Sequence, residues 1–79
     1  TSEETAVYVQ RIVKTANMNH AKFVMLVHNH PGGSLTPSLS DLDSTREAAQ
    51  ALQCVGVTLL DHFIVSRGEW FSMRENKMM

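Results

Sequence analysis

The chain has 79 residues, 43% of them hydrophobic, and carries a formal net charge of −1 at pH 7. This length allows one small domain whose apolar core is marginal without a metal ion, a partner or further chain, and the apolar content excludes an intrinsically disordered protein. The seven Lys and Arg residues are scattered, without a basic run or interleaved aromatic residues, so the usual electrostatic signature of direct nucleic-acid binding is missing.

Cys54 is the one cysteine of the chain. It excludes an intramolecular disulfide and fits a reducing cytoplasm. Its place late in a predicted helix indicates a small buried residue. The sequence contains no recognisable signal peptide, membrane-spanning segment or lipidation motif, so we expect a cytoplasmic protein without a membrane partner.

Residues 1–19 are predicted to form an amphipathic helix that begins at Thr1 or Ser2. Its apolar positions recur at intervals of three and four residues and would face a sheet: Val9, Ile12, Val13 and Ala16. The pattern breaks after residue 16, and His20 is interpreted as a solvated turn residue. Residues 22–28 follow as a buried strand that runs antiparallel to the helix, which brings the start of the helix close to His28.

His28 and His30 stand at the end of this strand. Side chains alternate along a strand, so both imidazoles can point to one side, with their Cα atoms about 6–7 Å apart. The turn residues 31–33 then bring Asp41 back toward the same point. Two imidazoles and a carboxylate are typical of a catalytic zinc site, although non-haem iron uses a similar set. The alternative is a pair of strand-end histidines that hydrogen-bond to the backbone.

A second helix is predicted from Ser38 or residue 39 to residue 55, ended by Gly56 in a left-handed conformation. Its expected buried stripe consists of Leu42, Thr45, Ala49, Leu52 and Val55. Ser38 and Asp41 also have the spacing of a helix N-cap, in which neither residue touches a metal. The two roles can coexist, because a carboxylate at a helix N-terminus favours its charged, metal-binding form.

Residues 57–66 are predicted to form a strand parallel to the first, with a right-handed crossover, and to place Leu60, His62 and Ile64 on one face. His62 either supports the metal ligands through a hydrogen bond or is a hydrogen-bonded core histidine. A hairpin turn at residues 67–69 leads into an antiparallel strand at residues 70–73. The predicted architecture is therefore α/β, a mixed sheet with flanking helices in the order α-β-α-β-β.

The motif His-x-His, seven residues, Ser, two residues, Asp resembles the JAMM (JAB1/MPN+) metalloprotease motif. The longer pattern is similar to the RadC family in particular: HNHP at residues 28–31, Gly33, Thr36, Pro37, Thr45, DHFIV at residues 61–65, Gly68, Trp70 and Ser72. This resemblance covers the whole chain as a single partial domain, residues 1–79, similar to the C-terminal part of the MPN/JAB (cytidine deaminase-like) fold.

The resemblance implies a role for each motif residue. His28, His30 and Asp41 would hold one zinc ion per chain, and Ser38 would hydrogen-bond the developing oxyanion. The implied reaction is hydrolysis of a peptide or isopeptide bond in a peptide or protein substrate. JAMM proteins carry their general-base glutamate on a strand that precedes this first helix. The resemblance therefore implies that the strand with the glutamate lies before residue 1. Glu3 or Glu4 could substitute for it, although acidic residues in a first helical turn are common for dipole reasons alone.

The sequence leaves two alternatives to an enzyme open. The first is a catalytically silent metal-binding or interaction module associated with DNA repair, a label that RadC proteins carry. The second is a scaffold that binds no metal and serves only for association. The strand at residues 23–27 would also present an unpaired sheet edge, which favours a homo-oligomer.

Overall fold

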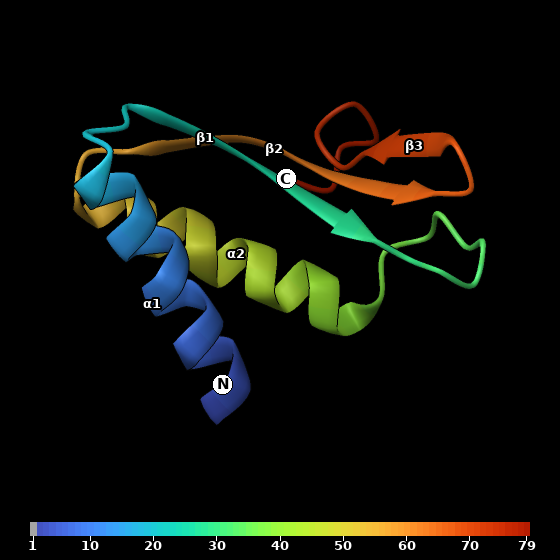
Figure 1. Ribbon diagram of the computed structural model, residues 1–79, viewed down its shortest axis with the longest axis horizontal. Coiled ribbons are helices and arrows are strands. Elements are labelled where there is room, and N and C mark those ends of the chain that lie inside the picture. Colours follow the sequence, from blue (N-terminus) through green and yellow to red (C-terminus); the bar gives the residue numbers. More distant parts are fainter. Residues whose placement is uncertain (1) are drawn as a thin grey trace.

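The computed structural model describes residues 2–79 and consists of two helices and three strands. In chain order these are α1 (Glu3–Met18), β1 (Phe23–Asn29), α2 (Leu39–Cys54), β2 (Thr58–Ser66) and β3 (Glu69–Ser72). Both helices lie on the same side of the sheet (Figure 1). The predicted α/β class and element order are confirmed, with bounds within two residues of those expected.

The strands form one mixed sheet in the order β1-β2-β3. β1 and β2 are parallel, as predicted, because α2 carries the chain from one to the other, whereas β2 and β3 are antiparallel. Arg67 and Gly68 join the antiparallel pair with φ angles of 49° and 79°. Two successive positive φ angles suit the right-handed twist of a tight hairpin.

The start of α1 is capped by Ser2, whose side chain accepts a hydrogen bond from the backbone N–H of Thr5. The alternative cap, Thr1, lies outside the described residues. His20 is exposed in the turn after α1, as predicted, with a φ of 52°.

The apolar core lies between the two helices and the sheet. Its buried members are Ala16, Leu52, Val57 and Leu59, and the half-buried residues around them are Ile12, Val13, Ala21, Val24, Leu26 and Ala49. The residues come from α1, α2, β1, β2 and the turns that lead into the two strands, so the core holds β1 and α2 on one scaffold. β1 leads directly to the histidine pair, and α2 begins with the turn that carries Asp41.

A β-bulge changes which residues of β2 face the core. Val24 pairs with Leu59, but the next residue of β1, Met25, pairs with Asp61, so Leu60 is the extra residue. Leu59 is buried and Leu60 is only half-buried, which corrects the prediction that Leu60 shares the inner face. His62 and Ile64 are both buried, as that prediction expected.

The buried side of α2 also differs from the predicted stripe. Thr45 and Leu52 are buried as expected, together with Asp41 and Ala48, at spacings of four, three and four residues. The predicted residues Leu42 and Ala49 are only half-buried.

α2 ends at Cys54, one residue before the predicted end, and Gly56 has the predicted positive φ, 76°. The predicted burial was wrong at this end, because Val55 is the C-cap and is 43% exposed. Cys54, expected to be buried, is exposed because it lies two residues beyond Leu52, off the inward row. Within residues 2–79 no helix is both long and apolar enough to cross a membrane.

Candidate metal centre

The three predicted ligands come together where β1 ends and α2 begins. Nδ1 of His28 lies 2.9 Å from Oδ1 of Asp41, and Nε2 of His30 lies 3.0 Å from Oδ2 of the same carboxylate. One ligand atom from each residue lies within 4.8 Å of the other two. The side chain of Asp41 is 7% exposed, that of His30 19% and that of His28 43%, so the group opens to solvent on the His28 side.

Asp41 is held by the first turn of α2. The Ser38 side chain accepts a hydrogen bond from the Asp41 N–H at 3.0 Å, and Oδ2 of Asp41 accepts one from the Ser38 N–H at 2.8 Å. This is a capping box, with Asp41 in the place usually taken by Glu or Gln. The predicted cap and the predicted site therefore coexist on the same two residues.

Burial raises the pKa of Asp41, but hydrogen bonds from Ser38 and the nearby charges of His28 and His30 outweigh it, so the pKa lies below its usual value. The carboxylate is thus ionised at neutral pH. An ionised carboxylate is the form that binds a cation.

The hydrogen bonds of His30 test whether this group suits a metal ion. Nδ1 of His30 lies 3.0 Å from the carbonyl oxygen of Ser34, which can only accept, so Nδ1 carries a hydrogen. In the neutral ring Nε2 is then a bare lone pair, and it faces Oδ2 of Asp41 at 3.0 Å. Two acceptors at this distance need a cation to compensate them, either a proton on the ring or a metal ion. The group could hold a metal ion on these grounds.

Residues of β2 hydrogen-bond to His30 and to Thr45 of α2. The Ser66 hydroxyl donates to the His30 carbonyl oxygen, and the His30 N–H donates to the carbonyl oxygen of Val65. His62 is 1% exposed, and its Nδ1 lies 2.6 Å from Oγ1 of Thr45 on α2. Burial, and secondarily the charge of His28, lower the pKa of His62, so its ring is neutral at pH 7.

A pocket of about 380 Å³ opens beside the group. The strands and α2 contribute Val27, His28, Asn29, Ser40, Asp41, Ser44 and His62 to it, and the first helix contributes Glu4, Thr5 and Tyr8. Glu4 therefore shares a pocket with His28 and Asp41, in keeping with the predicted direction of the helix. Glu3 does not line this pocket among the described residues; it lines a neighbouring hollow, to which Glu4 and Tyr8 also contribute. Ser38 is exposed next to Asp41 and does not line this pocket among the described residues.

Tyr8 is a pocket residue that the sequence reasoning missed. Burial and the charge of Asp41 raise the pKa of its phenol, so the hydroxyl is neutral over the physiological range. A signal was available, because Tyr8, Ile12 and Ala16 follow one another at intervals of four residues. Extending the apolar stripe by one turn would have placed Tyr8 on the inward side of the helix.

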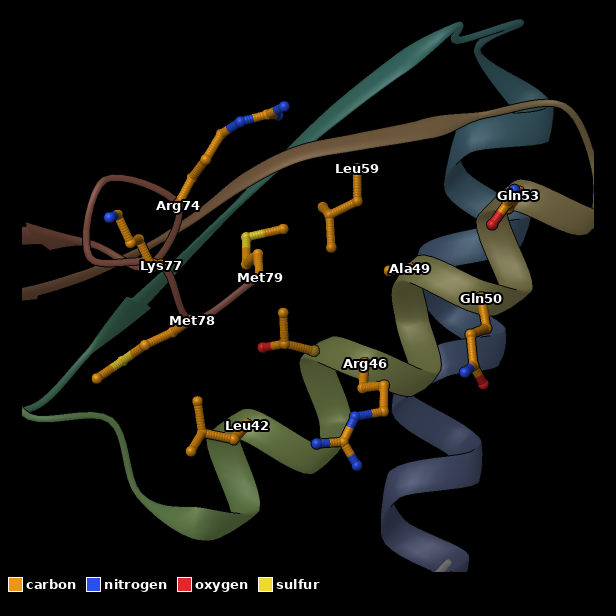
Figure 2. Close-up of a pocket in the computed structure, with 11 residues that line it drawn as sticks. Leu42, Arg46, Ala49, Gln50, Gln53, Leu59, Arg74, Lys77, Met78 and Met79 are labelled. Carbon is orange, nitrogen blue, oxygen red and sulfur yellow. The ribbon is translucent and has the colours of Figure 1, made fainter.

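A larger cavity, of about 570 Å³, lies between α2 and the C-terminal turn (Figure 2). Apolar side chains such as Leu42, Leu59 and Met79 line it, while the Arg46 side chain extends away from its centre. The three predicted ligands are not among its described lining residues. The smaller pocket is therefore the one that matters for the chemistry of the histidine pair.

Known proteins resemble this chain along nearly all of its length. A family profile described as RadC-like JAB domain matches residues 1–78. The UPF0758 protein of Neisseria meningitidis serogroup B is 44% identical over 79 residues, which are 100% of this chain and 35% of that protein. The UPF0758 proteins of Cupriavidus pinatubonensis and Actinobacillus pleuropneumoniae serotype 5b are 43% and 38% identical, over 96% and 98% of this chain and 33% and 35% of their own lengths. The chain spans about a third of the length of the curated relatives that it matches.

Proposed function

Because the chain belongs to the RadC-like JAB domain family, we propose that it carries the zinc site of a JAMM-type hydrolase that cleaves peptide or isopeptide bonds. The observation that supports this proposal is the convergence of His28, His30 and Asp41 on one point at the edge of an open pocket. The relatives are about three times as long as this chain, so we propose the hydrolase activity for a whole protein of this kind, of which this chain carries the metal site.

The donor atoms are close enough together to share one metal ion. The imidazole nitrogens lie 2.9 and 3.0 Å from the two oxygens of Asp41, and the three ligand atoms lie within 4.8 Å of one another, compared with about 3.3 Å between ligand atoms of a tetrahedral zinc ion with bonds of about 2.0–2.1 Å. Zinc held by such a set polarises a carbonyl group and makes a water-derived nucleophile available at neutral pH. Side chains of the protein must stabilise the oxyanion and accept the proton.

We assign two further steps to side chains of this chain. Oγ of Ser38 accepts from the Asp41 N–H, which leaves its own hydroxyl hydrogen to stabilise an oxyanion on the substrate. Glu4 reaches the pocket from α1 and is the proton acceptor we favour within these 79 residues. Tyr8, on the next turn of the same helix, would line the path of the substrate.

Metal binding is the first test. We expect about one equivalent of zinc per chain by elemental analysis after dialysis, and a loss of at least about tenfold in zinc affinity for His28→Asn. His20→Asn is the matched control, because His20 is exposed in a turn, and asparagine tolerates its positive φ. Equal zinc content and affinity in the two variants would overturn the proposed site.

The second candidate function is a catalytically silent metal-binding module that acts through a partner, with the link to DNA repair that the RadC label implies. The resemblance favours it for the isolated chain, because it places the general base outside the 79 residues. Chelator-sensitive cleavage of a peptide library by the zinc-loaded chain separates the two candidates. We expect weak cleavage and, given the net charge of −1, poor DNA binding at physiological salt; submicromolar DNA affinity would favour the module.

A further inference from the structure

His62 is the most enclosed polar side chain of the pocket. It is 1% exposed, yet it lines the same pocket as His28 and Asp41. Its Nδ1 contacts Thr45, but its Nε2 is buried and has no hydrogen-bond partner within the described residues 2–79. A buried polar atom without a hydrogen-bond partner destabilises the folded state, so a fold that keeps one at a site calls for an explanation.

The hydrogen bonds of Thr45 fix which nitrogen of His62 carries the hydrogen. Oγ1 of Thr45 lies 2.6 Å from the carbonyl oxygen of Asp41 and 2.6 Å from Nδ1 of His62. The hydroxyl has one hydrogen, and the carbonyl oxygen can only accept, so Thr45 donates to Asp41. Oγ1 must then accept from Nδ1–H of His62. In the neutral ring Nε2 is left as a bare lone pair.

The orientation of the ring directs this lone pair away from Thr45. Nδ1 and Nε2 are separated by Cε1 in the imidazole, so Nε2 cannot face Thr45 while Nδ1 does, and His62 lines the pocket. The ring of His62 also stacks against the ring of His28, with centroids 6.0 Å apart and an interplanar angle of 23°. His62 is not part of the group formed by His28, His30 and Asp41.

We infer that Nε2 of His62 is a fixed hydrogen-bond acceptor of the pocket, which binds a neutral N–H or O–H donor beside the histidine–aspartate group. Thr45 sets the tautomer and is a positioning residue. The identity of the donor rests on the proposed function: it is either the N–H of a scissile amide or a water molecule. Both present the same chemistry to Nε2.

The tautomer is tested by NMR of the metal-free chain, without any reference to activity. Long-range ¹H–¹⁵N correlation spectra of His62 should show hydrogen on Nδ1 and a bare Nε2. Thr45→Ser should keep this pattern, because serine retains the hydroxyl, and Thr45→Ala should lose it. Hydrogen on Nε2 in the unaltered chain would overturn the inference, whether or not the chain is an enzyme.

Two substitutions of His62 in the zinc-loaded chain test whether an acceptor at the position of Nε2 matters for cleavage. The amide of His62→Asn can reach only the position of Nδ1, whereas that of His62→Gln can present an oxygen near the position of Nε2. We expect kcat/KM to fall at least about tenfold in His62→Asn and less in His62→Gln, with zinc content unchanged. The inference fails if both variants cleave at the rate of the unaltered chain.

A matched peptide amide and peptide ester separate the two donors. A loss confined to the amide assigns the donor to the substrate N–H, and an equal loss on both assigns it to water. If the unaltered chain cleaves neither substrate, the proposed hydrolase fails, while the NMR result still decides whether Nε2 is an acceptor.

Discussion

Glu4, in the first turn of α1, lines the same pocket as His28, at the end of β1. The two residues share this pocket because the helix and the strand run in opposite directions on one core, which returns the start of the helix to the end of the strand. Glu3 is next to Glu4 in the sequence but is not among the described residues that line this pocket. This difference gives a matched pair for testing the proton acceptor.

We expect Glu4→Gln to lower the rate of chelator-sensitive peptide cleavage by about 10²-fold or more, the usual contribution of a general base. Glu3→Gln should leave the rate within about twofold, since its side chain faces a different hollow. Initial rates of the zinc-loaded variants, at equal zinc content, provide the measurement. Equal rates in the two variants would remove Glu4 from the mechanism.

The cap of α2 can be weakened without removing the Asp41 carboxylate. Ser38→Ala should lower the free energy of unfolding by about 1 kcal/mol, because the N–H of Asp41 loses its acceptor. Zinc affinity should change little, since the Ser38 N–H still donates to Oδ2 of Asp41. Urea denaturation and zinc titration of the same sample measure both quantities.

Ser40→Ala is the control for this prediction, because Ser40 is exposed on the same turn of α2. It should change the unfolding free energy by less than about 0.5 kcal/mol. A large loss of zinc affinity in Ser38→Ala would mean that the hydroxyl itself positions the site.

Stability should fall toward acid in two steps. Burial raises the pKa of Asp61, but hydrogen bonds from Ser72, Arg74 and the His62 N–H outweigh it, so the pKa lies below its usual value. Its ionised form stabilises the fold fully above the unfolded pKa of about 3.9, and that stability is lost as pH falls through the lower folded pKa. The pKa of His62 is also lowered, so its contribution is complete above about pH 6.5 and declines below it.

Urea midpoints between pH 3 and 8 measure these steps, and each substitution serves as a control for the other. Ser72→Ala should reduce the fall of the urea midpoint near about pH 4 and below, because the carboxylate of Asp61 loses a hydrogen-bond donor. His62→Gln should reduce only the fall of the urea midpoint that begins below about pH 6.5. Stability that rises on acidification would contradict both assignments.

β1 pairs on one side only within the described part of the chain, and we propose that a second copy pairs with its free edge. Met25 and Val27, which alternate along the strand, are 59% and 67% exposed. We expect a dimer by sedimentation at tens of micromolar, and a monomer for Met25→Lys, because a charged edge discourages strand pairing. Gln53→Lys, on an exposed position of α2, should leave the dimer intact; a monomeric unaltered chain at these concentrations contradicts the proposal.

The sequence by itself determined the order of the elements and the composition of the ligand group. Helix and strand periods, the glycine and proline turn at residues 31–33 and the spacing of His28, His30 and Asp41 are local properties, which neighbouring residues impose on one another. The capping role of Ser38 was also legible, because a cap depends on residues three positions apart.

Tertiary structure alone decided the features that depend on packing between distant segments. The bulge at Leu60 follows from the register of two strands, and the exposure of Cys54 follows from which row of α2 packs inward. The contact between Thr45 and His62 joins elements far apart in the chain. No local pattern encodes these distances, because they are set by how the side chains of separate elements fill one core.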